Sequence, residues 1–384
     1  MAKKGRLIDK EFLMAMATLI GTAIGAGIFG LPYVIAKAGF LPSMALMFLL
    51  GVMMLVTNLM YGEIILRSKK RCRLVGCAKR YLGGTGKQLA SFASFLSFYS
   101  GNMVYIILSG IFLNSLLSPS LGGDEFLYST LTFVFIFIVT RFDFKIFSLV
   151  ESWMVLLLVV IVGVVSFKSA PYIDTGNYMT SDFTQFFLPF GVILFSLGAS
   201  SAVPEIISII SKRKNRIKKV LTWGTILYTL IYVIFIAAIV GVTGDLTSEE
   251  SFVGLSHFIG DGVIVAGFFL GFLATITSYL VSNVALKEIF QYDYRMKEDS
   301  SWFLASIVPY LFFLIGYRDF IRVITFTGSV TGGLVGILII LIFYNAKEKG
   351  DRRPEYEINI SKGMSFLMIL VYLSGIIYGI IYNS

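Results

Sequence analysis

Four glycines and a proline interrupt the first long apolar segment of the chain, which covers residues 12–38. They stand in the stretch Gly21-Thr22-Ala23-Ile24-Gly25-Ala26-Gly27-Ile28-Phe29-Gly30-Leu31-Pro32. In lipid, non-helical backbone is tolerated only where it is buried in protein or lines a cavity. The N–H groups that open at such a break suit a carboxylate, and the carbonyls suit an ammonium or a small cation. A zwitterion such as an α-amino acid carries both charges.

A second break of the same kind interrupts the apolar segment 183–210. It reads Ser196-Leu197-Gly198-Ala199-Ser200-Ser201, with Pro189 before it and Pro204 after it. Interrupted apolar segments at corresponding positions of two halves are a pointer to the binding site of a transporter. The second break would offer the same two kinds of open backbone group as the first, with the opposite orientation.

The composition is that of a membrane protein. The chain has 384 residues, of which 57% are hydrophobic and 14% charged, with a mean hydropathy of +0.83. Charge is confined to short clusters between apolar runs long enough to cross a bilayer. We expect one all-α integral membrane domain, residues 1–384, with eleven transmembrane helices at 12–38, 43–66, 88–117, 125–140, 146–167, 183–210, 217–243, 261–290, 300–316, 319–344 and 363–382.

The net charge of +9 is a topology signal rather than a nucleic-acid footprint. If the N-terminus is cytoplasmic, all but four of the 32 lysines and arginines fall in cytoplasmic segments, the exceptions being Lys37, Lys168, Arg318 and Arg322. The positive-inside rule then places the N-terminus in the cytoplasm and the C-terminus outside the cell. We expect a multi-pass protein of the plasma membrane that binds no nucleic acid, and reduced thiols at Cys72 and Cys77 in a cytoplasmic loop.

The two broken helices cross in opposite directions and lie five spans apart. That arrangement is typical of an inverted repeat of five helices. The first repeat would cover residues 11–167 and the second 183–344, and the helix at 363–382 would be an addition to the repeat.

The stretch from Gly21 to Tyr33 resembles helix 1 of the amino acid/auxin permease family, in the amino acid–polyamine–organocation superfamily. Phe195-Ser196-Leu197-Gly198 resembles the helix 6 break of that family, and Pro204-Glu205-Ile206 the segment after it. The resemblance implies the leucine-transporter fold over the first ten helices. It also implies substrate-binding residues at the two breaks and on helix 3: Thr22, Ala23, Gly25, Ala26, Gly27, Phe195, Ser196, Leu197, Gly198 and Asn102.

Sodium-coupled members of this fold hold a cation between helices 1 and 8, so the resemblance also implies a sodium site. The matching groups here are the carbonyls of Gly21, Ile24 and Ala274 and the hydroxyls of Thr277 and Ser278. Hydroxyls in membrane helices also commonly bond back to their own carbonyls, which is the alternative for this pair.

Coupling to protons is the alternative to sodium. Proton-coupled relatives can place a lysine of helix 5 at the cation site, and the segment 146–167 has no lysine, which favours sodium. Glu63, Glu151 and Glu205 are ionisable groups near the cytoplasmic ends of their spans. They are candidates for a proton relay or for salt bridges of an inner gate.

These features predict a secondary active importer of amino acids that works by alternating access, as a symporter with bound sodium and no organic cofactor. An enzyme is disfavoured because the single histidine, His257, is extracellular and no aspartate lies well inside a span. An amino acid sensor with little flux is the alternative from another class. The sequence leaves the amino acid and the oligomeric state open.

Overall fold

The computed structural model describes residues 2–69, 72–142, 147–210 and 214–383, with side chains for all of these except 2–9, 147–155, 261, 292 and 293. It is all-helical in its regular structure. Eight helical stretches in the described ranges are long and apolar enough to cross a membrane, or nine if a bent pair counts as one span. Two shorter apolar helices, Glu125–Val139 and Leu156–Tyr172, accompany them.

The first half of the chain forms six α-helices. They are α1 (Ala2–Ala23), α2 (Gly27–Ala38), α3 (Phe40–Arg67), α4 (Leu74–Leu121), α5 (Glu125–Val139) and α6 (Phe147–Ser169). The axes of α1 and α2 differ by 53° across the glycine-rich break, so the break predicted in the first span is present. Helix α4 begins well before the predicted span and bends at Gly83, whose φ of 76° favours glycine.

The second half contains the other break and the C-terminal helices. They are α7 (Leu188–Ser196), α8 (Val203–Ile209), α9 (Ile217–Thr243), α10 (Asp261–Glu288), α11 (Glu298–Ile315), α12 (Phe320–Phe326), α13 (Gly333–Lys349) and α14 (Lys362–Asn383). The predicted break in the sixth span separates α7 from α8. A π-helical turn, Thr327–Gly332, joins α12 to α13.

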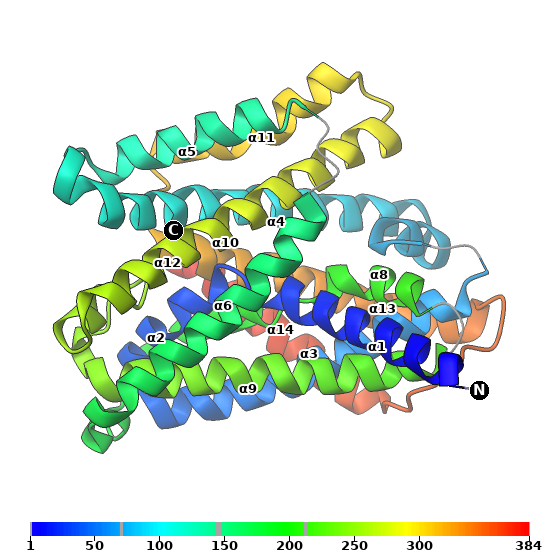
Figure 1. The fold of residues 1–384 in the computed structure, drawn as a ribbon. Helices are drawn as coiled ribbons and strands as arrows, with labels where there is room; N and C mark the ends of the chain where they lie inside the picture. Colours follow the sequence, from blue (N-terminus) through cyan, green and yellow to red (C-terminus); the bar gives the residue numbers. More distant parts are fainter. Residues whose placement is uncertain (1, 70–71, 143–146, 211–213, 384) are drawn as a thin grey trace.

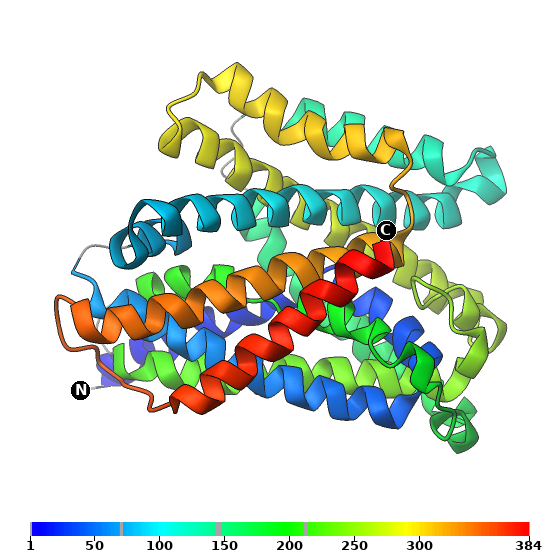
Figure 2. The same ribbon diagram turned by 180° about the vertical axis from the view of Figure 1, so that it is seen from behind.

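The helices run roughly along one direction, with α6 and α14 crossing the others obliquely on opposite faces (Figures 1 and 2). Helix α1 begins at one end of the bundle, and α14 finishes toward the other end (Figure 1). Helices α5 and α11 lie together along one edge, where Phe133 stacks on Tyr310 with ring centroids 3.8 Å apart.

Large apolar side chains remain exposed on the outer faces of several helices, among them Phe48, Phe92, Trp223 and Phe366. Soluble monomers rarely leave extensive apolar surface uncovered. Together with the long apolar helices, this surface identifies a multi-pass integral membrane protein.

The expectation of free thiols is wrong for this structure, in which Cys72 and Cys77 form a disulfide. Cys72 lies just before α4 and Cys77 in its first turns, which brings their Cα atoms to 5.3 Å. That separation lies within the range that a disulfide spans without backbone movement. The sequence argument considered only the redox compartment and not this local geometry.

Candidate functional site

The break between α1 and α2 leaves both kinds of backbone group open. Ile24 N–H still donates to Ile20, but Gly25 N–H turns back to the carbonyl of Ala23 at 3.0 Å. Among the described residues, no backbone acceptor meets the N–H groups of Ala26 and Gly27, and no backbone donor meets the carbonyls of Gly21 and Thr22. The open amides stand at the start of the 12-residue α2, where the helix dipole favours an anion.

The break after α7 is built in a similar way. The N–H of Leu197 closes the last helical turn by donating to Ile193, and Gly198 N–H donates to Phe195 at 3.1 Å. The chain then turns through Ser200–Ala202 before α8 begins. The carbonyls of Ser196 and Leu197 therefore project from the end of a helix, where the dipole favours a cation or a donor.

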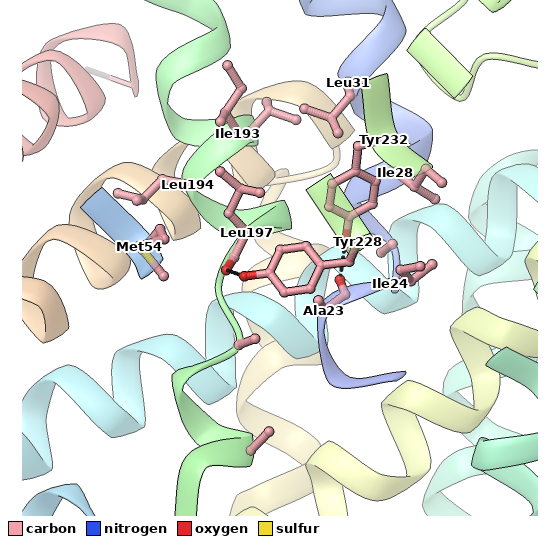
Figure 3. Packing of buried hydrophobic residues seen from close by; sticks show 14 of the residues in the cluster. Ala23, Ile24, Ile28, Leu31, Met54, Ile193, Leu194, Leu197, Tyr228 and Tyr232 are labelled. Atoms are coloured by element: carbon pink, nitrogen blue, oxygen red, sulfur yellow. Dashed lines mark hydrogen bonds between the residues drawn. The ribbon is translucent and has the colours of Figure 1, made fainter. Parts of the chain in front are cut away.

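Two tyrosines of α9 approach these carbonyls. The Tyr232 hydroxyl lies 2.5 Å from the Ala23 carbonyl and 3.0 Å from the Ser196 carbonyl, and it can donate to either. The Tyr228 hydroxyl donates to Leu197 O at 3.2 Å (Figure 3). Both side chains are fully buried. A single phenol thus links the ends of the two broken helices, a contact that the sequence analysis did not predict.

Close packing also joins the breaks. A methyl group added at Gly27 would lie 2.3 Å from the Ser196 hydroxyl oxygen and 2.9 Å from the Ser196 Cα. Only a residue without a Cβ permits this approach. The two breaks are thus in direct contact at Gly27.

A cavity of about 1290 Å³ reaches the breaks. Of the predicted substrate-binding residues, Thr22, Ala23, Gly25, Ala26, Phe195 and Gly198 line it. Gly27, Ser196 and Leu197 are buried directly behind this wall. Asn102 is fully buried away from the lining, and its amide nitrogen and oxygen find no hydrogen-bond partner among the residues that the structure describes.

The outer part of the cavity is strongly basic. Its lining includes Arg73, Lys79, Arg80, Lys87 and Arg295, beside the carboxylates of Glu205 and Glu288. These residues belong to the segments that the charge pattern assigns to the cytoplasm. The cavity therefore leads from the breaks toward the basic end of the bundle.

Aromatic side chains fill the space on the other side of the breaks. Phe29 of α2 makes an edge-on contact with Phe112 of α4, with ring centroids 4.9 Å apart, and Phe252 packs against both. Ser251, beside Phe252 in the loop before α10, donates a hydrogen bond to the carbonyl of Phe29. All four residues are buried. We call this group of rings, completed by Phe268, the aromatic plug.

The predicted sodium ligands are only partly assembled. A methyl group at Gly25 would lie 4.0 Å from the Ser278 hydroxyl oxygen, so the break adjoins α10, and Gly21 and Ser278 both line the cavity. The Thr277 hydroxyl instead donates to the Ala274 carbonyl at 3.0 Å. The lone pairs of the Thr277 hydroxyl oxygen remain able to coordinate a cation. Oxygen ligands of this kind fit a small hard cation, with Ile24 buried beside them.

The predicted carboxylates have different surroundings. Glu63 is fully buried, pairs with Arg67 at 2.8 Å and accepts a hydrogen bond from the Ile358 backbone N–H at 2.7 Å. Glu205 is exposed in the cavity wall, in the first turn of α8. The side chain of Glu151 lies outside the described residues.

The segment 350–361 between α13 and α14 supplies one partner of Glu63, the backbone amide of Ile358. In this segment, which we call the strap, Tyr356 donates to Leu59 O at 2.8 Å and Arg352 donates to Leu66 O at 2.6 Å. Asp351 forms an ion pair with Arg80. The strap thus holds the end of α3 against the C-terminal helices.

The chain is similar to known proteins in sequence and in fold. The model of the tryptophan/tyrosine permease family matches residues 9–381. A curated relative, tyrosine-specific transport system 2 of Haemophilus influenzae, is 23% identical over 97% of this chain and 95% of its own length. The crystal structure of MhsT in complex with L-phenylalanine matches with a TM-score of 0.64 and 15% identity, over 96% of this chain and 98% of MhsT.

The MhsT likeness shows the fold, which agrees with the all-helical architecture predicted from the apolar segments. The predicted amino acid transport is confirmed by the family match, which points to a transporter rather than an enzyme. The chain belongs to the tryptophan/tyrosine permease family.

Proposed function

We propose that this permease is a secondary active importer of aromatic amino acids. The observation that carries the proposal is the pair of helix breaks that meet beside one cavity. Ala26, with an open amide, and Ala23, with a carbonyl, line the cavity, and the open amide of Gly27 and the carbonyl of Ser196 lie directly behind them. The amides suit the substrate carboxylate, and the carbonyls suit its ammonium. The family and the tyrosine-specific relative support an aromatic side chain.

The mechanism we propose is alternating access across eleven membrane crossings arranged as two inverted repeats of five plus α14. The cavity that opens toward the basic end and the aromatic plug at the other end fit a state open to the cytoplasm. In this proposal the N-terminus is cytoplasmic and the C-terminus extracellular. A substrate would shift the equilibrium only by binding the two states with different affinities.

Sodium is the coupling ion we propose, bound between α1 and α10. By linkage, sodium would raise the affinity for the amino acid by the same factor as the amino acid raises the affinity for sodium. Proton coupling through Glu205 is the second candidate, because this carboxylate is exposed in the cavity wall.

Uptake into proteoliposomes tests both parts. We expect uptake of labelled tyrosine to be driven by an inward sodium gradient at equal pH. Replacing Thr277 and Ser278 together by Ala should weaken the sodium dependence. Thr275→Ala is the matched control, since this buried hydroxyl donates to the Gly271 carbonyl and does not line the cavity. Uptake that follows a proton gradient and is lost in Glu205→Gln would transfer the proposal to proton coupling.

A further inference from the structure

The π-helical turn Thr327–Gly332 forms one wall of the cavity. Thr327, Gly328, Thr331 and Gly332 line the cavity, whereas Thr325 and Ser329 of the same segment do not. A π-helical turn is uncommon and often accompanies a functional site. Thr327 and Thr331 are four residues apart and both are buried, so they meet the cavity rather than bulk solvent.

This turn lies at the level of the substrate-binding break. A methyl group at Gly328 would be 1.8 Å from the Gly191 carbonyl oxygen and 2.7 Å from the Phe195 nitrogen. A methyl group at Gly332 would touch the Leu194 side chain at 3.2 Å. The turn therefore packs directly on the last residues of α7, whose carbonyls face the proposed ammonium position. The turn and the two breaks therefore line the same cavity.

The two hydroxyls in this wall are acceptors. Thr327 donates its hydrogen to the Val323 carbonyl at 2.7 Å, and Thr331 donates to the Thr327 carbonyl at 2.5 Å. A hydroxyl has one hydrogen and two lone pairs, so what remains for a ligand is the ability to accept. The phenol O–H of tyrosine and the indole N–H of tryptophan are both donors, and phenylalanine has neither.

One threonine and two serines that also line the cavity are less well placed for this role. The Thr57 hydroxyl is already bonded to the Met53 carbonyl and to the Tyr372 hydroxyl. Ser94 and Ser97 precede Tyr105 on α4 by 11 and 8 residues. At 1.5 Å of rise per residue, these two serines lie roughly 16 and 12 Å nearer than Tyr105, another lining residue, to the basic outer part of the cavity.

We propose that Thr327 and Thr331 form the subsite that accepts the donor at the tip of an aromatic substrate and so distinguish tyrosine and tryptophan from phenylalanine. The proposal rests on the proposed function, because it takes the amino acid to be anchored at the breaks. A net hydrogen bond of ordinary strength corresponds to a preference of about 3- to 10-fold.

The test measures competition for tyrosine uptake in proteoliposomes by unlabelled tyrosine, tryptophan, phenylalanine, 4-aminophenylalanine and 4-fluorophenylalanine. The amino group keeps a donor at the ring tip and the fluorine does not. In the wild type we expect the three donor-bearing compounds to compete about 3- to 10-fold better than the other two. In Thr327→Val combined with Thr331→Val, this ratio should fall toward one, while the affinity for phenylalanine is kept.

Thr325→Val is the matched control, because this threonine is buried in the same segment away from the cavity and should leave the ratio unchanged. Thr331→Ser keeps the hydroxyl and should also keep the ratio. Each ratio is taken within one preparation, so the amount of folded protein cancels. An unchanged ratio in the double variant, with tyrosine still transported, would overturn the subsite alone. A wild type that transports none of these amino acids would contradict the proposed function itself.

Discussion

At the scale of single residues, Gly25 and Gly27 of the first break have different structural roles. A methyl group at Gly25 would meet only the Ser278 hydroxyl oxygen, at 4.0 Å, which is an ordinary contact. A methyl group at Gly27 would overlap the backbone of Ser196. Gly27 is therefore required by the packing of one break on the other, whereas Gly25 borders open space at the cavity wall. The sequence motif makes these two glycines look equivalent.

Tyr232→Phe tests the link between the two broken helices. Removing the Tyr232 hydroxyl leaves the Ala23 and Ser196 carbonyls without this donor, while the ring stays in place. We expect the free energy of unfolding to fall by about 1–2 kcal/mol. The affinity for the amino acid should change as well, because the two carbonyls belong to the proposed substrate site. Thermal unfolding and ligand-induced stabilisation of the purified protein measure the two effects.

Tyr356→Phe is the matched control for Tyr232→Phe. It removes another buried phenol hydrogen bond, to Leu59 O, at the strap and away from the breaks. The control should lower the stability without altering the affinity for the amino acid. Equal effects of both substitutions on that affinity would contradict a specific link at the breaks.

Among residues, the sequence predicted those whose type is unusual for their surroundings. Glycines and polar residues inside apolar segments mark the breaks because lipid penalises open backbone. Tyr228 and Tyr232 carry no such mark, since the chain has 20 tyrosines and aromatic residues are ordinary in membrane helices. Their partners are backbone carbonyls more than 30 residues away, which local spacing does not reveal.

At the scale of elements, helix breaks were predictable and helix extensions were not. Glycine and proline act locally, so the ends of α1 and α7 fall where the sequence analysis expects them. Helix α4 begins before its predicted span. The sequence analysis did not predict this extension, because the basic start of the helix lacks the apolar pattern of a membrane span. The π-helical turn depends on how Gly328 packs against Gly191, a contact between distant parts of the chain.

The loop before α10 should make stability depend on pH. Burial, with the neighbouring carboxylates of Asp319, Glu250 and Glu125, raises the pKa of Glu249 from its ordinary value near 4.5 to about 7. Between these values the folded protein holds a proton that the unfolded chain has released, so its stability falls as the pH rises from about 4.5 to 7. Above pH 7 this contribution stays lost.

Glu249→Gln removes that dependence. We expect the variant to gain thermal stability relative to the wild type at pH 8, and to gain less at pH 5, where Glu249 is already protonated in the folded state. Asp245→Asn, which removes an exposed carboxylate of the same loop, is the control. A gain of equal size at both pH values would show that the titration of Glu249 does not affect stability.

At the scale of the whole molecule, the cavity and the aromatic plug give the two ends of the bundle different access to the breaks. Ser201→Cys, in the cavity wall, tests this asymmetry after Cys72 and Cys77 have been replaced by serine. We expect a membrane-impermeant thiol reagent to label it from the side of the basic loops, and bound tyrosine to slow the labelling. Ser109→Cys, at a fully buried position of α4, should stay unlabelled.

Labelling of Ser201→Cys from the opposite side alone would contradict the orientation proposed from the charge pattern.

The all-helical membrane fold itself was predictable, because it follows from the length and spacing of the apolar segments. The direction in which the cavity opens was not, since it depends on which of several packed arrangements the same helices adopt.

The bond between Glu63 and the strap has a consequence for biosynthesis. The Glu63 carboxylate accepts a hydrogen bond from the Ile358 backbone N–H, and the two residues are 295 positions apart in the sequence. At 5–20 residues per second, a ribosome needs roughly 15–60 s to add that length of chain. During this interval the nascent α3 has its Arg67 neighbour but lacks the strap. The end of α3 that carries Glu63 can reach its final form only when synthesis of the protein is almost complete.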